Sequence, residues 1–154
     1  MLETSRNHDP MRDCRWTVTT TGANQTIVVG YASHGLRRSL FSEICLDYVK
    51  ISHRDRAPIW VCGDDTKSVD VFPHSVNFTL HLNPTWTMES ASALVVLYVT
   101  AASLPDSMGQ CKNGSFFCAV SGICIWDGFI CDGVANCLDY DDEHLFYGST
   151  CRKR

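Results

Sequence analysis

The sequence has 154 residues, a formal net charge of −4 at pH 7 and an apolar content of 45%. An apolar content this high excludes a compositionally disordered chain, and the slight excess of acidic residues argues against a nucleic-acid partner. The length fits one ordinary domain or two small ones.

The first two thirds of the sequence shows the period of two that is typical of β-strands. Apolar and polar residues alternate in short runs, and no helical period persists. Short strands separated by turn residues predict an antiparallel sandwich. The predicted strands cover residues 16–20, 27–29, 45–51, 59–61, 76–82 and 94–99, with a turn at 22–24.

Three cysteine-containing motifs in this part resemble the CUB domain family. The family opens on Cys-x-Trp, as at residues 14–16, and continues with a cysteine followed by Asp-Tyr, a hydrophobic residue and Ile, as from Cys45 to Ile51. A Cys-Gly pair follows at residues 62–63. The resemblance covers residues 12–102 and implies a mostly β protein with an antiparallel CUB-like β-sandwich that is incomplete at its N-terminal side.

The same resemblance has consequences for three cysteines. It implies that Cys45 pairs with Cys62, and closing such a loop stabilises a fold by about 3 kcal/mol in the chain-entropy model. The family's other bridge joins an earlier cysteine to the position of Cys14, and this sequence has no earlier cysteine. Cys14 is therefore predicted to be unpaired, and we expect the sequence to be an N-terminally truncated piece of a longer protein.

Asp47 is a candidate metal ligand that we expect to bind no metal. Many CUB domains bind calcium through acidic side chains in their end loops, and Asp47 matches one of these. The position of the family's later carboxylate falls near residues 82–85, which contain none. Because calcium needs several oxygen ligands at once, we interpret Asp47 as a strand-entry residue whose carboxylate binds the backbone.

Cysteine content and charge both change near residue 110. Residues 111–151 hold six of the nine cysteines, and six acidic residues against one basic residue. So short a segment cannot bury a sufficient core, and its cysteine density is typical of a disulfide scaffold. The predicted organisation is a partial first domain at 1–104, a linker at 105–110, a disulfide-rich module at 111–151 and a basic tail at 152–154.

The spacing of these six cysteines is Cys-x6-Cys-x5-Cys-x6-Cys-x5-Cys-x13-Cys, and by spacing alone about fifteen pairings are possible. Together with Cys131-Asp-Gly and the acidic run from Cys137 to Glu143, the spacing resembles the LDL-receptor class A module. The resemblance covers the whole segment and implies a small fold with little regular structure. The disulfides that it implies are Cys111–Cys124, Cys118–Cys137 and Cys131–Cys151.

An acidic run lies inside this framework, with six carboxylates in the 17 positions from Asp127 to Glu143. In a compact fold these charges repel one another, and a divalent cation removes the repulsion. Calcium takes about six to eight oxygen ligands of this kind. The alternative is a solvated acidic loop, which is what most charge runs are. Because cysteines frame the run, we expect bound calcium (Ca2+).

A residue-by-residue match to the family implies the calcium ligands. The side chains are Asp132, Asn136, Asp142 and Glu143, and the backbone carbonyls are those of Phe129 and Val134. Asn136 stands where the family usually has Asp, so one charge is lost and weaker binding is expected. Phe129 stands where the family often has a Trp that contacts a partner's lysine, and Phe129 and Asn136 are therefore the predicted ligand contacts.

Dense cysteines and three N-x-[ST] sequons, at Asn24, Asn77 and Asn113, predict an extracellular glycoprotein, either secreted or the ectodomain of a membrane protein. The first eight residues are polar where an export signal has its apolar core, so we do not expect residue 1 to be the natural start. The most apolar run, 91–102, is too short to span a bilayer and is predicted to be a buried strand, so no membrane span is expected in this chain.

The sequence lacks the Gly-x-Ser-x-Gly, His-Glu-x-x-His and phosphate-loop motifs, and we do not expect an enzyme. The leading hypothesis is a protein-binding fragment of a receptor or co-receptor ectodomain, with structural calcium in the class A module and an extracellular protein ligand held through a lysine. Two alternatives stay open: a non-catalytic regulatory segment of an extracellular serine protease, and a truncated, non-functional gene product.

Overall fold

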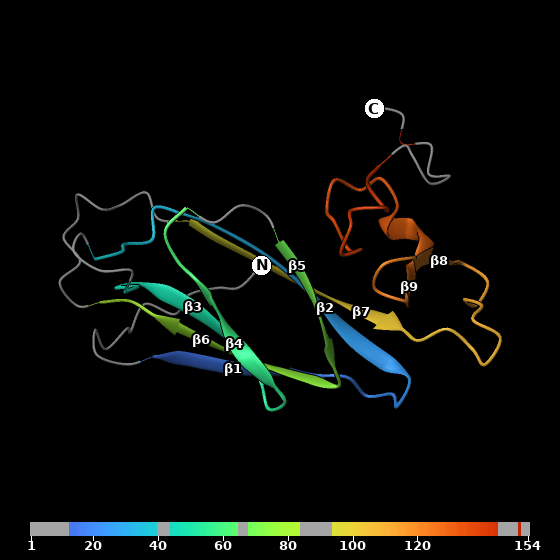
Figure 1. The fold of residues 1–154 in the computed structure, drawn as a ribbon, viewed down its shortest axis with the longest axis horizontal. Helices are drawn as coiled ribbons and strands as arrows, with labels where there is room; N and C mark the ends of the chain where they lie inside the picture. Colours follow the sequence, from blue (N-terminus) through green and yellow to red (C-terminus); the bar gives the residue numbers. More distant parts are fainter. Residues whose placement is uncertain (1–12, 40–43, 65–67, 84–93, 145–150, 152–154) are drawn as a thin grey trace.

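The computed structural model describes residues 13–39, 44–64, 68–83, 94–144 and 151. Within these ranges the protein is mostly β, with two antiparallel sheets and no α-helix. Figure 1 shows the two sheets and, at the C-terminal side, a segment with little regular structure. The mostly β prediction is therefore confirmed at the level of two antiparallel sheets and a disulfide-rich C-terminal segment.

The first sheet has four antiparallel strands. The strands, in their order across the sheet, are β1 (Cys14–Thr19), β6 (Ser75–His81), β3 (Tyr48–His53) and β4 (Arg56–Val61). The edge strand β1 pairs with β6, which lies some sixty residues later in the chain. The paired residues run from Cys14 opposite Leu80 to Thr19 opposite Ser75.

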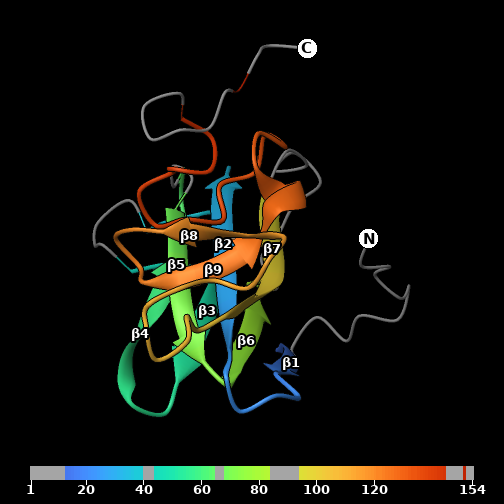
Figure 2. The same ribbon diagram turned by 90° about the vertical axis from the view of Figure 1, so that its right-hand side faces the viewer.

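The second sheet contains the two longest strands in the described part of the chain. In order across the sheet its strands are β5 (Ser68–Pro73), β2 (Gln25–His34), β7 (Leu94–Ser103), β9 (Ile123–Trp126) and β8 (Ser115–Cys118). β9 joins β7 through one residue pair, Ser103 opposite Cys124. The β8–β9 hairpin runs crosswise to β5, β2 and β7 (Figure 2).

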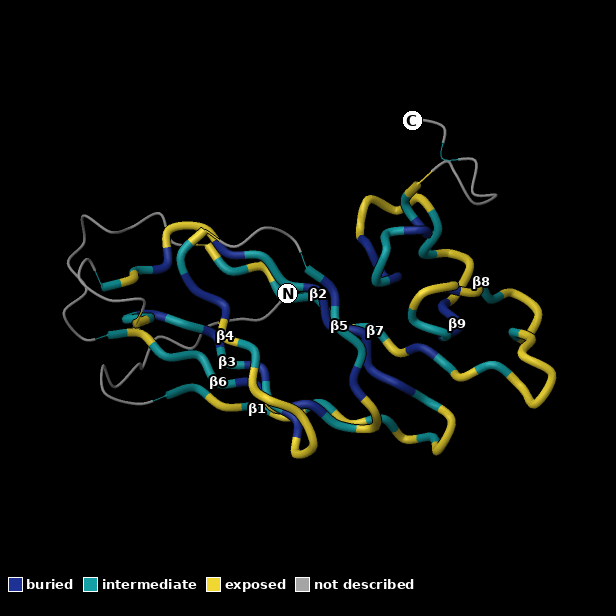
Figure 3. The backbone as a smooth tube through the Cα atoms, viewed as in Figure 1, coloured by how far each residue is buried: buried dark blue, intermediate teal, exposed yellow. Residues whose placement is uncertain are grey.

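Alternate side chains of both sheets fill the space between them. Val49 and Ile51 of β3, and Val76 and Phe78 of β6, are fully buried in one cluster with residues of β2 and β5. The Trp16 ring of β1 stacks on Phe78 with 5.3 Å between the ring centroids. The period of two in the sequence thus places one face of each of the strands β1 to β7 in a shared core, and Figure 3 shows which residues along the chain are buried.

A second core lies on the other face of the second sheet. Ile27 and Val29 of β2 point into the core between the sheets, whereas Val28 packs against the C-terminal segment. A strand that is buried on both faces is continuously apolar, which explains the run at 27–29. The second core combines sheet residues with residues of the C-terminal segment: Val28, Val69, Ala102, Cys118, Ile123, Ile125, Ala135 and Cys137.

The structure contains a strand at each of the six predicted positions, although the strand ends differ. The prediction of a buried strand in the run at 91–102 is wrong for its described part, because Leu94, Val96 and Val99 of β7 are exposed. The strands predicted at 16–20 and 27–29 do not pair with each other, however, because β1 belongs to the first sheet and β2 to the second. The chain between them crosses from one layer to the other. Three strands were not predicted: β5, β8 and β9.

The predicted linker at 105–110 forms a turn around one carboxylate. The backbone N–H groups of Met108 and Gln110 donate to Asp106 Oδ1 at 2.9 and 2.8 Å. The N–H of Gly109 donates to the Asp106 carbonyl, and Gly109 has a φ of 75°, which favours glycine. The basic tail at 152–154 lies outside the described residues.

Candidate functional site

The C-terminal segment is a hairpin followed by a tightly turned loop. After β9 the chain makes one short 3-10 helix, η2 (Asp127–Phe129). Three later residues have φ values in the left-handed region: Cys131 (62°), Gly133 (86°) and Tyr140 (62°). These turns fold the acidic run back on itself, so that the N–H of Cys131 donates to the Asp142 carbonyl at 2.9 Å.

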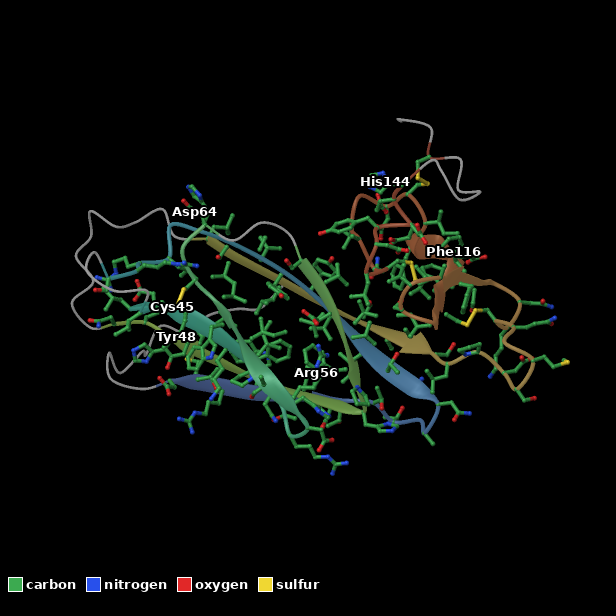
Figure 4. All side chains as sticks on the ribbon, viewed as in Figure 1. Cys45, Tyr48, Arg56, Asp64, Phe116 and His144 are labelled. Carbon is green, nitrogen blue, oxygen red and sulfur yellow. A yellow bond between two sulfur atoms is a disulfide. The ribbon has the colours of Figure 1, made fainter. Side chains whose placement is uncertain are left out.

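Four disulfides are present, and they join the same pairs that the two resemblances imply. Cys45–Cys62 lies at one end of the two-sheet part, where Figure 4 labels Cys45. The other three belong to the C-terminal segment: Cys111–Cys124, Cys118–Cys137 and Cys131–Cys151. Cys14 is half-buried on β1 and forms none of these disulfides.

The Asp142 carboxylate organises the acidic loop from its centre. The side chain is fully buried, and its oxygens accept the backbone N–H of Asn136 at 2.6 Å and that of Cys137 at 3.1 Å. Glu143 Oε2 accepts the N–H of Gly133 at 3.0 Å. At the surface of the loop, Asp132 Oδ1 accepts the N–H of Val134 at 2.8 Å and so closes a local turn. Backbone amides therefore fix the positions of the predicted carboxylate ligands.

The surroundings of Asp142 and Glu143 raise the pKa of both carboxyl groups. Burial raises the pKa of Asp142 above its ordinary value, although the N–H groups of Asn136 and Cys137 act in the opposite direction. Burial also raises the pKa of Glu143; the N–H of Gly133 opposes the rise, and the charges of Asp142 and Asp132 add to it. A nearby cation would reverse this effect, because it favours the charged form.

The donor set fits calcium, but the described geometry does not gather it around one point. Glu143 Oε1 is buried and has no hydrogen-bond partner among the described residues. Hard oxygen donors of this kind are the ligands that calcium prefers. In the part of the chain that the structure describes, however, no group of three or more His, Cys, Asp or Glu side chains is placed to hold a metal ion. The calcium site therefore stays a prediction.

Asn136 lies inside the molecule and not on its surface. Its side chain is fully buried; Oδ1 accepts a hydrogen bond from Thr100 Oγ1 at 2.9 Å, and Nδ2 donates to the Val134 carbonyl at 2.8 Å. A side chain this buried is not accessible to an external lysine. The other predicted ligand contact, Phe129, is half-buried, with its ring edge-on to exposed Trp126 at 5.4 Å between centroids.

Strand β7 contributes two residues to this site that the sequence reasoning missed. Thr100 bonds Asn136, and the Tyr98 hydroxyl donates to the Ala135 carbonyl. Burial, and then the charges of Tyr140 and of nearby acidic residues, raise the pKa of Tyr98. Gly30, opposite Tyr98 on β2, leaves room for the ring, since a Cβ there would overlap it. The sequence feature that could have indicated this role is the pair Tyr98 and Thr100, two hydrogen-bonding side chains on one face of a strand that is otherwise mostly apolar.

Asp47 belongs to a separate, cation-paired cluster. Its fully buried carboxylate accepts Arg37 Nε at 2.6 Å, Arg37 Nη2 at 2.9 Å and the N–H of Asn83 at 2.8 Å. Burial alone would raise the pKa of Asp47, but the bonds from Arg37 and Asn83 outweigh it and the pKa is lowered. The predicted backbone bonds are present, and the guanidinium of Arg37 is an additional partner that was not predicted.

The three sequon asparagines, Asn24, Asn77 and Asn113, are all exposed. Asn77 lies on β6, where Thr17 of the neighbouring strand donates to its Oδ1 at 2.7 Å. Glycosylation at these positions stays a prediction.

No protein-family model matches the chain, and none of the curated proteins compared with it matches either. Among the described residues, no helix has the length and apolar character that crossing a membrane requires. The fold and the site together define a mostly β protein of two antiparallel sheets whose C-terminal segment is built on three disulfides.

Proposed function

We propose that this chain is an extracellular protein-binding segment of a receptor or co-receptor ectodomain, in which a CUB-like sandwich carries a calcium-binding class A module. The observation that carries the proposal is the acidic loop framed by the disulfides of Cys118, Cys131 and their partners. A multiply cross-linked segment is typical of oxidising compartments. Recognition is then the task of the chain, and no reaction is assigned to it.

The residues of the loop would hold calcium with oxygen donors alone. The donors are the side chains of Asp132, Asn136, Asp142 and Glu143 and the carbonyls of Phe129 and Val134. Bound calcium supplies positive charge and cross-links the loop. Glu143 Oε1, which is buried without a donor, gains a partner in that state, and the raised pKa values of Asp142 and Glu143 fall.

The proposed partner is an extracellular protein that presents a lysine. Phe129 offers an aromatic face for the ammonium group, and the exposed Trp126 beside it adds a second ring. Asp132 is exposed on the same loop and adds negative charge. Because Asn136 is buried, we assign the external contact to Phe129 and its neighbours.

Calcium titration of the oxidised, full-length chain by calorimetry tests the proposal. We expect saturable binding below millimolar calcium, and a rise in melting temperature with calcium concentration, because a ligand that binds only the folded state stabilises it. Glu143→Gln should weaken binding at least about tenfold, because it removes one of the site's charges from direct coordination. Asp142→Ala should abolish binding.

Asp127→Ala is the matched control, since Asp127 is an exposed carboxylate of the same acidic run and no predicted ligand. Its calcium affinity should equal that of the wild type. Because Asp142 also holds two backbone amides, its variant is checked for folding by circular dichroism, and Glu143→Gln serves if folding is lost. No binding at millimolar calcium by the folded wild type would end the calcium proposal.

A further inference from the structure

The Asn136 side chain has a hydrogen-bond partner at each end of its amide. Oδ1 accepts from Thr100 Oγ1 on β7, and Nδ2 donates to the Val134 carbonyl in the acidic loop. The residue is fully buried, so water does not compete for either bond. The amide therefore links the loop to the sheet through two directed bonds.

This amide orientation conflicts with metal binding. Asn136 Oδ1 and the Val134 carbonyl are two of the oxygens that would hold calcium, but Oδ1 is directed at Thr100 and the Val134 oxygen faces the Asn136 NH2 group. The Nδ2 group carries two hydrogens and no lone pair for a metal, and it lies 2.8 Å from the Val134 oxygen.

We propose that Asn136 is a two-position amide switch for which Thr100 is the partner in both positions. A half turn about the Cβ–Cγ bond exchanges the amide oxygen and nitrogen while the shape of the side chain is kept. Oδ1 then faces the Val134 carbonyl and is available to a cation, and Nδ2 faces Thr100. The inference deepens the proposed function and rests on it, since the turn is driven by calcium.

A threonine suits both positions because a hydroxyl both donates and accepts. In the described position Thr100 donates to Oδ1; after the turn its oxygen accepts from Nδ2. Thr100 is fixed in the sheet, opposite Val28 of β2. An aspartate at position 136 would need no such turn, because both of its oxygens accept hydrogen bonds and bind cations. With asparagine at position 136, calcium binding therefore competes with the internal hydrogen bond from Thr100 to Oδ1.

Nuclear magnetic resonance of the full oxidised chain, with 15N-labelled asparagine and 13C-labelled valine carbonyl groups, observes the turn directly. Without calcium we expect a coupling across the bond from Asn136 Nδ2 to the Val134 carbonyl. With saturating calcium that coupling should be lost, and the Asn136 amide protons should gain strong cross-peaks to the Thr100 methyl group. Asn136→Asp assigns the signal by removing it, and the exposed amide of Asn113 should not respond.

Thr100→Val provides the second test, because it keeps the shape and removes the hydroxyl. If Thr100 bonds the amide in both positions, the melting temperature falls equally with and without calcium, and calcium affinity stays within about threefold of the wild type. Thr17→Val is the control: its hydroxyl also bonds an asparagine Oδ1 from a strand, but at an exposed site far from the loop in the sequence. It should change neither property to the same extent.

Each other outcome overturns the switch in a different way. A tenfold gain in calcium affinity in Thr100→Val would mean that Thr100 bonds only the calcium-free position, and a tenfold loss that it bonds only the calcium-bound one. Retention of the bond to Val134 at saturating calcium would show that the amide does not turn. If the folded wild type binds no calcium, the proposed function fails first, and the switch falls with it.

Discussion

The Asp47→Asn variant is expected to lose about 3 kcal/mol of unfolding free energy at neutral pH, because it breaks a buried ion pair from one side. Arg37 would keep its charge but lose the carboxylate with which it forms a bidentate pair. The expected loss is at the low end of the range for buried pairs, since the guanidinium of Arg37 retains some access to water. Urea unfolding followed by tryptophan fluorescence measures the difference.

The effect of this substitution should depend on pH with a definite sign. The pKa of Asp47 is lowered in the folded state, so the unfolded state binds the proton more tightly. The stabilisation by Asp47 is therefore complete above about pH 4, near the ordinary carboxyl pKa, and is lost as the pH falls through the lower folded-state pKa. Wild type and Asp47→Asn should therefore converge in stability as the pH falls through the lowered folded-state pKa of Asp47.

Asp55→Asn is the matched control for this pair. Asp55 also bonds an arginine, Arg54 at 3.1 Å, but both side chains are well exposed. Exposed pairs of this kind contribute about 0–1 kcal/mol. Equal losses in Asp47→Asn and Asp55→Asn, or a difference that does not change with acid, would contradict the stabilising role given to the buried pair.

The second large effect is expected from Gly30→Ala, which should loosen the C-terminal segment from the sheet. In a strand, replacing glycine by alanine ordinarily stabilises, because it restricts the unfolded chain. At Gly30 the added methyl group would overlap the Tyr98 ring. The ring must move, its bond to the Ala135 carbonyl is lost, and overpacking of this kind costs about 1–3 kcal/mol.

Amide hydrogen exchange locates this effect. The N–H groups of Asn136 and Cys137 should exchange faster in Gly30→Ala, while those of the first sheet stay protected. Tyr98→Phe should reproduce part of the change, at about 1 kcal/mol for one hydrogen bond. Gly22→Ala is the control, because a methyl group there meets only the far end of the Gln25 side chain. Unchanged exchange in both Gly30→Ala and Tyr98→Phe would contradict docking through Tyr98.

Six of the described strands could be predicted from the sequence, whereas β5, β8 and β9 were not. The alternation in 76–82 marks a strand because burial on one face repeats at the period of the backbone, and β6 lies there. The disulfide pairs were implied by resemblance to two families, and the structure contains the same four pairs. Spacing alone left the pairings of the last six cysteines open.

Contacts between residues that are distant in the sequence could not be predicted, because no local pattern of residues specifies them. Asp47 showed no sign of its partner Arg37, ten residues earlier, since any of several arginines could have been brought to it by the fold. Thr100 and Asn136 are further apart still, and their contact depends on how the hairpin crosses the sheet. The regular strand pattern also favoured pairing between neighbouring strands, whereas β1 and β2 lie in different layers.

The disulfide between Cys131 and Cys151 also has a mechanical consequence. Tension applied beyond residue 151 does not peel the acidic loop from its end, because the covalent bridge passes the load directly to Cys131. From there it reaches the sheet through the second core and the bond from Tyr98 to Ala135. Under such a force, we therefore expect the β8–β9 hairpin to separate from the rest of the second sheet before the disulfide-linked acidic loop unfolds.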